Sequence, residues 1–161
     1  MPTWLWITGC IVVAVLAGYA GMLLAKLHQQ TKRQAAMEEK AIGQRNFKLF
    51  DSIFIIAHAG REAQCDLSEA SIRLGVLFDL VQGDLRIDFA EAYPNLNTLY
   101  EGVRDMPRGD ARKAQPKKER MRNDVTRMKL EAELQDSIHE ELNVILARRE
   151  ETMAQLAPFA A

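Results

Sequence analysis

The 161-residue sequence has few of the residues that interrupt helices, with nine glycines and five prolines. It also lacks any alternating run of β-branched residues that would indicate a strand. Its commonest residues, such as Ala, Leu, Glu, Lys, Arg and Gln, favour helix over sheet. We therefore predict an all-α protein, and the sequence shows no internal repeat.

Cysteines and aromatic residues are also scarce, and their positions exclude several functions. Cys10 lies in an apolar segment and Cys65 lies far from it, so no disulfide framework is expected, as in proteins of a reducing compartment. The formal net charge is −1, so no global field attracts nucleic acid. No Phe, Tyr or Trp lies between Glu101 and Pro158. The stacking surface of a single-stranded nucleic-acid site is therefore missing there.

Charged residues are absent from Pro2 to Ala25. The run from Trp4 to Leu24 would form a helix roughly 31 Å long at ~1.5 Å per residue, which matches the ~30 Å hydrocarbon core of a bilayer. Lys26 and Lys32 follow this run, and no Lys or Arg precedes it. The positive-inside rule then places the N-terminus outside and the rest of the chain in the cytoplasm. We therefore predict a transmembrane anchor over residues 1–25.

A cleaved signal peptide is the alternative interpretation of this segment. Gly18-Tyr19-Ala20 resembles a small-x-small cleavage site. A signal peptide, however, carries basic residues before a shorter apolar core. Here the basic residues follow an apolar run of full membrane-spanning length, so we favour the anchor.

Small residues recur within the same segment. Ala14, Gly18 and Gly21 are three or four positions apart, a spacing that lets two membrane helices pack closely. A homodimer formed through these residues is one hypothesis. The other is that glycine is simply common in membrane-spanning helices.

The rest of the chain is expected to form a polar helical stalk over residues 26–46 and a helical domain over residues 47–157. Apolar residues at i, i+3, i+4 and i+7 spacing mark the buried faces of these helices. We expect helices from Phe47 to Gly60, from Asp66 or Ser68 to near Gln82, and from Pro94 to near Val103, with a short helical turn over residues 88–93. Asp66 and Glu69 resemble a capping box at the start of the second of these helices.

A long last helix is expected from about residue 116 to about residue 156. One of its faces carries Met121, Val125, Met128 and Ala132. A slightly rotated face continues with Leu134, Ile138, Leu142 and Ile145. The spacing is close to a heptad repeat for part of the length, so the helix either packs along the bundle or projects as a coiled-coil arm.

No catalytic or metal-binding motif is complete. His139-Glu140-Glu141-Leu142-Asn143 has Asn where the zinc-protease motif needs its second His. His58 and Cys65 have no further Cys or His nearby to complete a zinc site. The sequence contains no Gly-rich phosphate loop and no GxSxG elbow. We therefore expect no enzyme activity, cofactor or metal.

Charge is strongly segregated along the domain. Residues 104–129 hold ten basic and four acidic residues, a local charge of +6, whereas residues 62–101 hold eight acidic and two basic residues, a local charge of −6. Three partners could balance the basic segment: the acidic part of the same domain, anionic lipid headgroups, or an acidic protein. The candidate interaction residues are Arg112, Lys113, Lys117, Lys118 and Arg120.

Several strings along the chain resemble a known family. They are Gln64-Cys65-Asp66-Leu67-Ser68-Glu69-Ala70 with Ile72-Arg73-Leu74, then Met106-Pro107, Ala111-Arg112-Lys113 and Lys117-Lys118-Glu119-Arg120-Met121. Together with the N-terminal span they resemble an uncharacterised bacterial family, domain-of-unknown-function family 2489. The resemblance implies a bacterial inner-membrane setting and a small helical domain. It implies no activity, cofactor or catalytic residue.

Three functional hypotheses follow. The first is a membrane-tethered interaction module that binds a protein partner through the start of the last helix or through the long helix itself. The second is an enzyme, or a regulator of one, with a site around Cys65, Asp66, Glu69 and Arg73. The third is peripheral sensing of anionic lipid by residues 104–129. Nucleic acid is disfavoured as a partner.

Overall fold

The computed structural model describes the backbone of residues 3–160 and the side chains of Ala14 and of residues 16–160. Helices and turns make up this described part, which contains no strand, so the all-α prediction is confirmed. The chain divides into two compact units, Met1–Ala41 and Ile42–Ala161.

The first unit consists of the first part of helix α1, which runs from Thr3 to Arg61. Every residue whose burial is described between Ala14 and Ala41 is exposed, Gly18 and Gly21 included. Among the helices that the structure describes, none is both long and apolar enough to span a bilayer. Residues 4–13 and Val15 of the predicted span lie outside the described side chains.

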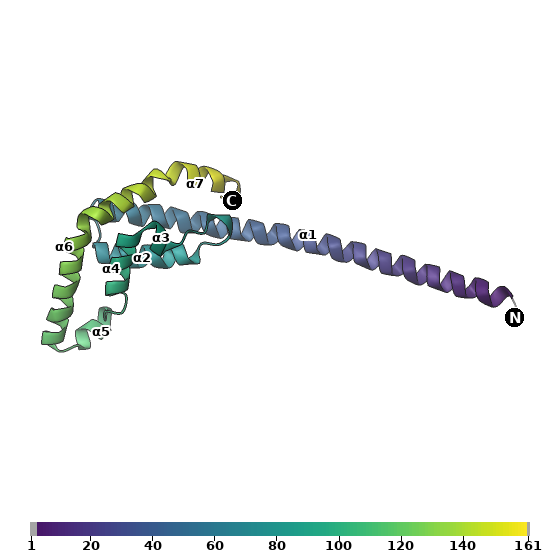
Figure 1. Cartoon of the computed structure of the whole chain (residues 1–161), viewed down its shortest axis with the longest axis horizontal. Coiled ribbons are helices and arrows are strands. Elements are labelled where there is room, and N and C mark those ends of the chain that lie inside the picture. Colours follow the sequence, from purple (N-terminus) through teal and green to yellow (C-terminus); the bar gives the residue numbers. More distant parts are fainter. Residues whose placement is uncertain (1–2, 161) are drawn as a thin grey trace. The chain divides into compact units, whose positions relative to one another are not determined.

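The second unit is a helical bundle that starts with the last part of α1 (Figure 1). Its further elements are α2 (Leu67–Leu80), η1 (Gly83–Leu85), α3 (Phe89–Ala92), α4 (Pro94–Val103), α5 (Gly109–Ala114), α6 (Lys117–Ala147), α7 (Arg149–Leu156) and η2 (Ala157–Phe159). Helix α5, which covers one and a half turns, was not predicted from the sequence.

The core of this bundle follows the predicted apolar stripes. It contains Phe50, Ile53, Phe54 and Ala57 of α1, Leu74, Phe78 and Val81 from α2 and its end, Tyr93, Leu96, Leu99 and Val103 around α4, Ile138, Leu142 and Ile145 of α6, and Leu156 of α7. Aromatic rings form its centre, with the ring centroid of Phe78 at 5.3 Å from that of Tyr93 and 6.4 Å from that of Phe50. Burial of such side chains contributes about 1.5–3 kcal/mol each.

Helix α6 has two halves with different environments. In its second half Ile138, Leu142 and Ile145 are buried in the core. In its first half Met121, Val125 and Met128 are 58%, 45% and 60% exposed. The second half therefore packs on the bundle, which is one of the two predicted alternatives, while the first half leaves its apolar face uncovered.

The single last helix expected over residues 116–156 is wrong in one respect. Helix α6 ends at Ala147, and α7 starts at Arg149. The backbone N–H of Arg148 donates to Ile145 and Leu146, so the chain makes a tight turn at this point. The turn lets Leu156 reach the core. No glycine or proline marks this break, so the sequence carries no signal for it.

The segment after α7 packs against α1 at Gly43. A Cβ atom at residue 43 would lie only 2.4 Å from Cγ of Phe159. Glycine at this position therefore lets the Phe159 ring lie directly on the helix backbone. A second link between distant segments joins the side-chain amide of Asn46 to the backbone of Gln82, with hydrogen bonds of 2.7 and 3.2 Å.

The starts of α2 and α4 are capped by glutamates of α6. The backbone N–H groups of Asn95 and Leu96 donate to the two carboxylate oxygens of Glu141, at 2.9 and 2.8 Å. The backbone N–H of Ser68 donates to Glu131 at 3.2 Å, and its hydroxyl donates to the same oxygen. Each carboxylate satisfies donors that have no partner within their own helix and lies at the positive end of the helix dipole.

The predicted capping box at the start of α2 is therefore wrong. Asp66 occupies the N-cap position, but its side chain makes no capping hydrogen bond. Glu69 binds Arg73 one turn later, with its oxygen 2.6 Å from Nε. The cap comes instead from Glu131, which a search for local capping patterns cannot find.

We predict that Glu141→Ala lowers the free energy of unfolding by about 1–3 kcal/mol, because partly buried N–H donors of α4 lose their acceptor. Urea unfolding of the full chain, followed by far-UV circular dichroism, measures this change. Glu140→Ala is the matched control, since Glu140 is exposed and adjacent in sequence. Equal shifts of the two midpoints would contradict the role assigned to Glu141.

Candidate binding cleft

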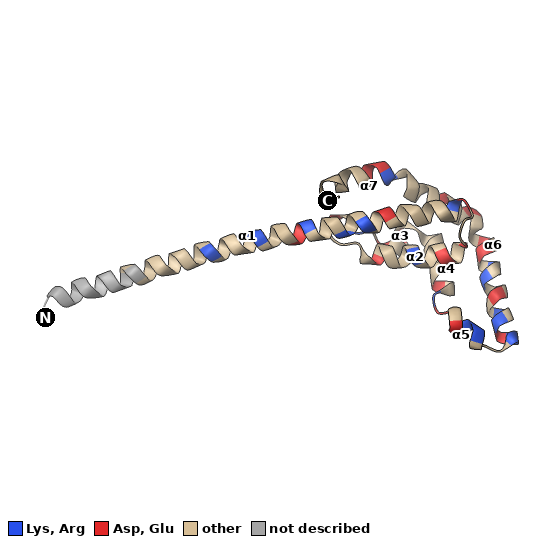
Figure 2. Ribbon diagram, turned by 180° about the vertical axis from the view of Figure 1, so that it is seen from behind, with Lys and Arg blue, Asp and Glu red and all other residues tan. Residues whose placement is uncertain are grey.

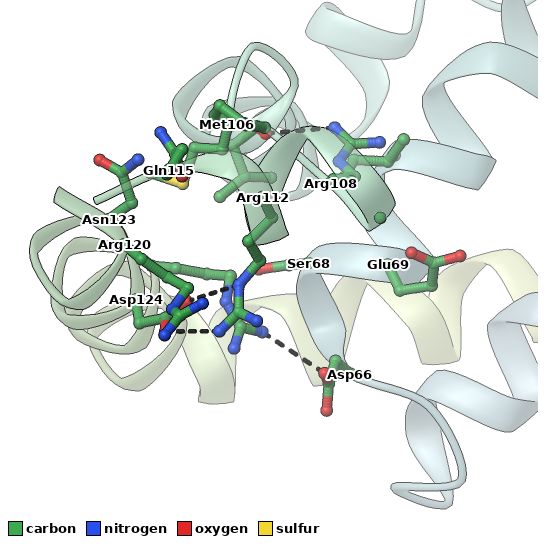
Figure 3. Close-up of a pocket in the computed structure, with 15 residues that line it drawn as sticks. Asp66, Ser68, Glu69, Met106, Arg108, Arg112, Gln115, Arg120, Asn123 and Asp124 are labelled. Carbon is green, nitrogen blue, oxygen red and sulfur yellow. Dashed lines mark hydrogen bonds and ion pairs between the residues drawn. The ribbon is translucent and has the colours of Figure 1, made fainter. Parts of the chain in front are cut away.

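A cleft lies within the second unit, where the start of α2 meets the α4–α5 connection, α5 and the first half of α6 (Figure 3). Its volume is about 300 Å³. Its lining combines four arginines, three acidic residues, three uncharged polar residues and an apolar part. The residues are Arg108, Arg112, Arg120, Arg127, Asp66, Glu69, Asp124, Ser68, Gln115, Asn123, Ile72, Val103, Met106, Pro107 and Gly109.

The chain reverses direction at the edge of this cleft. Pro107 and Gly109 follow the end of α4, and Gly109 adopts a φ of 55°, which glycine tolerates best. Arg108 donates from Nη2 to the carbonyl oxygens of Val103 and Arg104, at 3.2 and 2.8 Å. These bonds satisfy carbonyl groups at the end of α4, where a positive charge is also favourable.

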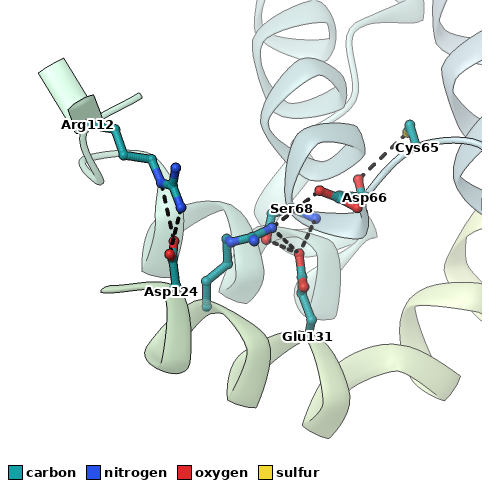
Figure 4. Close-up of polar contacts among 7 residues, drawn as sticks. Cys65, Asp66, Ser68, Arg112, Asp124 and Glu131 are labelled. Atoms are coloured by element: carbon teal, nitrogen blue, oxygen red, sulfur yellow. Dashed lines mark hydrogen bonds and ion pairs between the residues drawn. The ribbon is translucent and has the colours of Figure 1, made fainter. Parts of the chain in front are cut away.

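Arg112 connects α5 to α6 by a two-point ion pair (Figure 4). Its Nη2 lies 2.6 Å from Oδ2 of Asp124, and its Nε lies 3.3 Å from Oδ1. The hydrogen bond from Arg112 lowers the pKa of Asp124, and the positive charges of Arg112, Arg127 and Arg120 act in the same direction, against a smaller opposing effect of burial. The pKa of Asp124 is therefore held below its ordinary value, which favours the charged form that binds Arg112.

Arg127 connects α6 to the start of α2. Its Nη1 lies 3.4 Å from Oδ2 of Asp66 and 3.4 Å from Oε1 of Glu131. The same Glu131 oxygen accepts from Ser68, so one carboxylate joins two helices and a guanidinium (Figure 4). The wall of the cleft on the α2 side is therefore held by a connected polar network.

The acidic residues of the cleft already have cationic partners. Asp124 pairs with Arg112 and Asp66 pairs with Arg127, while Glu69 pairs with Arg73, which does not line the cleft.

The arginines of the cleft are not all neutralised. Arg108 binds only carbonyl oxygens. The side chain of Arg120 makes no hydrogen bond or ion pair with any residue that the structure describes. Two guanidinium groups without a carboxylate partner thus line one cavity, and its surplus charge is positive.

The cleft combines parts of the two sites that the sequence suggested separately. From the basic set it takes Arg112 and Arg120, while Lys113, Lys117 and Lys118 are exposed and do not line it. Lys113 instead pairs with Asp110, at 2.9 Å.

The second predicted site contributes Asp66 and Glu69 to the cleft but not Cys65 or Arg73. Residues that sequence reasoning did not select include Arg108, Arg127, Ser68 and Glu131. Arg108 and Arg127 belong to the basic segment that was recognised, whereas nothing local marks Ser68 or Glu131.

Cys65 does not have the environment of an activated thiol. Its Sγ lies 3.7 Å from the carbonyl oxygen of Asp66. Partial burial raises its pKa, the positive charge of Arg73 partly offsets this, and the negative charges of Glu69 and Asp66 add to the increase. The thiolate form, which is the nucleophile, is therefore disfavoured.

Metal-binding chemistry finds no support in the described residues, which contain no group of three His, Cys, Asp or Glu side chains that could hold an ion. Within the incomplete protease-like motif, Glu141 caps α4.

The arrangement of the cleft is suited to binding an anion that also carries an apolar group.

The comparisons with known proteins identify the class of this chain. Residues 13–145 match the family described as "Protein of unknown function (DUF2489)", and the chain belongs to that family. It is also similar to an uncharacterized protein of Haemophilus influenzae, with 37% identity over 142 residues that cover 88% of this chain and 93% of that protein. No solved structure matches the chain.

We predict that alkylation of Cys65, measured against pH in a Cys10→Ser background, reaches its half-maximal rate at a higher pH than in the urea-unfolded chain. The reason is that a raised pKa in the folded protein leaves less thiolate at any given pH below it. A half-maximal rate at a lower pH in the folded protein would instead support a nucleophilic role for Cys65.

Proposed function

We propose that this protein is a membrane-tethered interaction module that binds an acidic, amphipathic helix of a partner protein. The binding surface would be the first half of α6. The observation that carries this proposal is an exposed apolar stripe with unpaired basic residues beside it. We name α5 and the first half of α6, residues 109–133, the basic arm (Figure 2).

The apolar stripe of the basic arm consists of Met121, Val125 and Met128. These residues are spaced i, i+4 and i+7, so they share one face of the helix. Leu130 packs on the other side, where its Cδ1 lies 2.8 Å from the position that a Cβ at Gly102 would take. The stripe is therefore directed away from the bundle. Methionine is common at protein-binding surfaces because its flexible side chain adapts to different partners.

Basic residues flank this stripe. Lys118, Arg122 and Lys129 are exposed and lie on a neighbouring face of α6. None of the three forms an ion pair with a residue that the structure describes. Internal pairing with the acidic part of the domain is limited to Arg104 with Glu101 and Arg127 with Asp66. The charges of Lys118, Arg122 and Lys129 thus remain available to an acidic partner.

A protein partner fits this surface better than a bilayer or a second copy of the chain. The stripe is narrow, and the described part of α6 offers no aromatic side chain, whereas interfacial membrane helices carry Trp, Phe or Leu on their apolar face. A second copy would bring the same basic residues face to face, which is unfavourable. An acidic amphipathic helix complements both the charge and the stripe.

The proposal that the protein is anchored in a membrane is supported by its sequence. Residues 4–24 are uncharged and long enough to span a bilayer, and basic residues follow them. In this proposal the N-terminus lies outside the bacterial inner membrane and the helical domain lies in the cytoplasm.

We predict that a photocrosslinking amino acid at Val125 captures a protein whose crosslinked segment, identified by mass spectrometry, is acidic and amphipathic. The same amino acid at Asn143, on the second half of α6, should not capture it. Replacing Lys118, Arg122 and Lys129 together by Glu should lower the yield at least tenfold, because the charge complementarity is reversed.

A matched control replaces Lys48, Arg86 and Arg149 by Glu, which gives the same change of net charge at exposed positions away from the basic arm. The proposal fails if this control lowers the yield equally, or if the captured segment is not acidic. Crosslinks to lipid alone, or to a second copy of the chain, would replace the proposed partner by those partners.

We predict that the full chain stays in the membrane after carbonate washing and that a chain lacking residues 1–25 does not. Protease added from the outer side of the inner membrane should leave residues 26–161 intact, because the domain lies on the cytoplasmic side. Release of the full chain by carbonate, or digestion of the domain from outside, would contradict the anchor or its orientation.

A further inference from the structure

The cleft at the base of the basic arm joins a charged part to an apolar part. Arg108 and Arg120 supply guanidinium groups that form no ion pair with a carboxylate of the described chain. The apolar part of the lining comes from the side chains of Ile72, Val103, Met106 and Pro107. Such a combination of an apolar surface with a few polar groups is typical of sites for small ligands or chain ends.

We propose that this cleft binds the free C-terminal carboxylate of a partner protein whose last residue is apolar. The inference rests on the proposed function, because it assigns a second contact to the same partner. The carboxylate would bind Arg120, with Arg108 nearby, and the side chain of the last residue would pack on Met106 and its apolar neighbours.

The charge of the lining selects an anion. Both oxygens of Asp124 are engaged by Arg112, and Asp66 is engaged by Arg127, and neither carboxylate forms an ion pair with Arg120. Guanidinium groups bind carboxylates through two parallel hydrogen bonds, which adds geometric specificity to the charge attraction.

The apolar lining selects a peptide end over inorganic phosphate. Phosphate would leave the partly exposed Ile72, Met106 and Pro107 uncovered, whereas a C-terminal residue carries its carboxylate and its side chain on one Cα atom. One residue can therefore reach both parts of the cleft. A volume of about 300 Å³ lies at the lower end of the range for ligand sites, ~300–1,000 Å³, which suits one residue and its carboxylate.

Four peptides test this inference with the full chain in nanodiscs of neutral lipid. The first is Gly-Ser-Gly-Ser-Leu with an N-terminal fluorophore and a free C-terminus. The second is its C-terminal amide, the third ends in Gly in place of Leu, and the fourth carries an internal Asp before an amidated Leu. Fluorescence anisotropy gives the dissociation constant of each peptide, and inorganic phosphate is added as a competitor.

We expect the free acid to bind at least tenfold more tightly than the amide and at least fivefold more tightly than the peptide ending in Gly. The inference is overturned if the free acid does not bind, if the amide binds equally well, or if phosphate displaces the peptide at equal concentration. Equal binding of the internal Asp peptide would also overturn it, because the site would then recognise any carboxylate beside an apolar residue.

Variants locate the site. Arg120→Gln should weaken binding of the free acid about tenfold. Arg149→Gln is the matched control, because Arg149 is basic and exposed, lies outside the basic arm and does not line the cleft. Its dissociation constant should stay within twofold of the unmodified chain. Equal losses in both variants would remove the cleft from the account.

These results are separable from a failure of the proposed function. If the crosslink at Val125 finds an acidic helix but the free acid does not bind, the basic arm binds its partner and the cleft inference is wrong. If the free acid binds through Arg120 but no protein is captured at Val125, the cleft is a carboxylate site and the proposed docking surface on α6 is wrong.

Discussion

Two glutamates of α6 cap the first turns of two other helices. Glu131 accepts from the start of α2, and Glu141 accepts from the start of α4. They are ten residues apart on α6, which corresponds to about 15 Å along its axis. Neither capped helix has a capping side chain of its own, since Asp66 makes no such bond and Tyr93 precedes α4. The placement of α2 and α4 against α6 therefore depends on these two carboxylates as well as on apolar burial.

The cleft is a consequence of the first of these contacts. Glu131 holds α6 against the start of α2 and at the same time binds Arg127, which reaches Asp66. On the other side of the cleft, the ion pair between Arg112 and Asp124 joins α5 to α6. The three carboxylates that line the cleft form ion pairs with other arginines in this arrangement, and Arg120 forms none with the described residues. The positive surplus of the cleft thus arises from the way in which the fold is held together.

The two halves of α6 differ in how much they bury. Its second half contributes Ile138, Leu142 and Ile145 to the core, so substitutions there act on folding. Its first half buries little and carries basic residues near a helix N-terminus, where the helix dipole disfavours them by about 0.3–1 kcal/mol per charge. An acidic partner bound to the basic arm would offset this unfavourable term.

Most helices could be predicted from the sequence because apolar spacing and Pro94 are local signals. The break at Arg148 and the short helix α5 could not, since no glycine or proline marks the first and α5 contributes no buried residue. The cap by Glu131 and the joining of Asp66 to the basic segment depend on residues some sixty positions apart, at |i−j| of 63 and 61. For that reason, the sequence suggested two separate sites where the structure has one cleft.

The packing of Phe159 on Gly43 can form only after nearly the whole chain has been synthesised. The two residues are 116 positions apart in the chain. At about 5–20 residues per second, a ribosome needs roughly 6–23 seconds to pass from one to the other. During this interval the apolar face of α1 from Phe50 to Ala57 exists without its partners from α6 and α7. A nascent chain of this protein therefore holds this helix face with only its α2 and α4 partners for seconds, before the last helices complete the core.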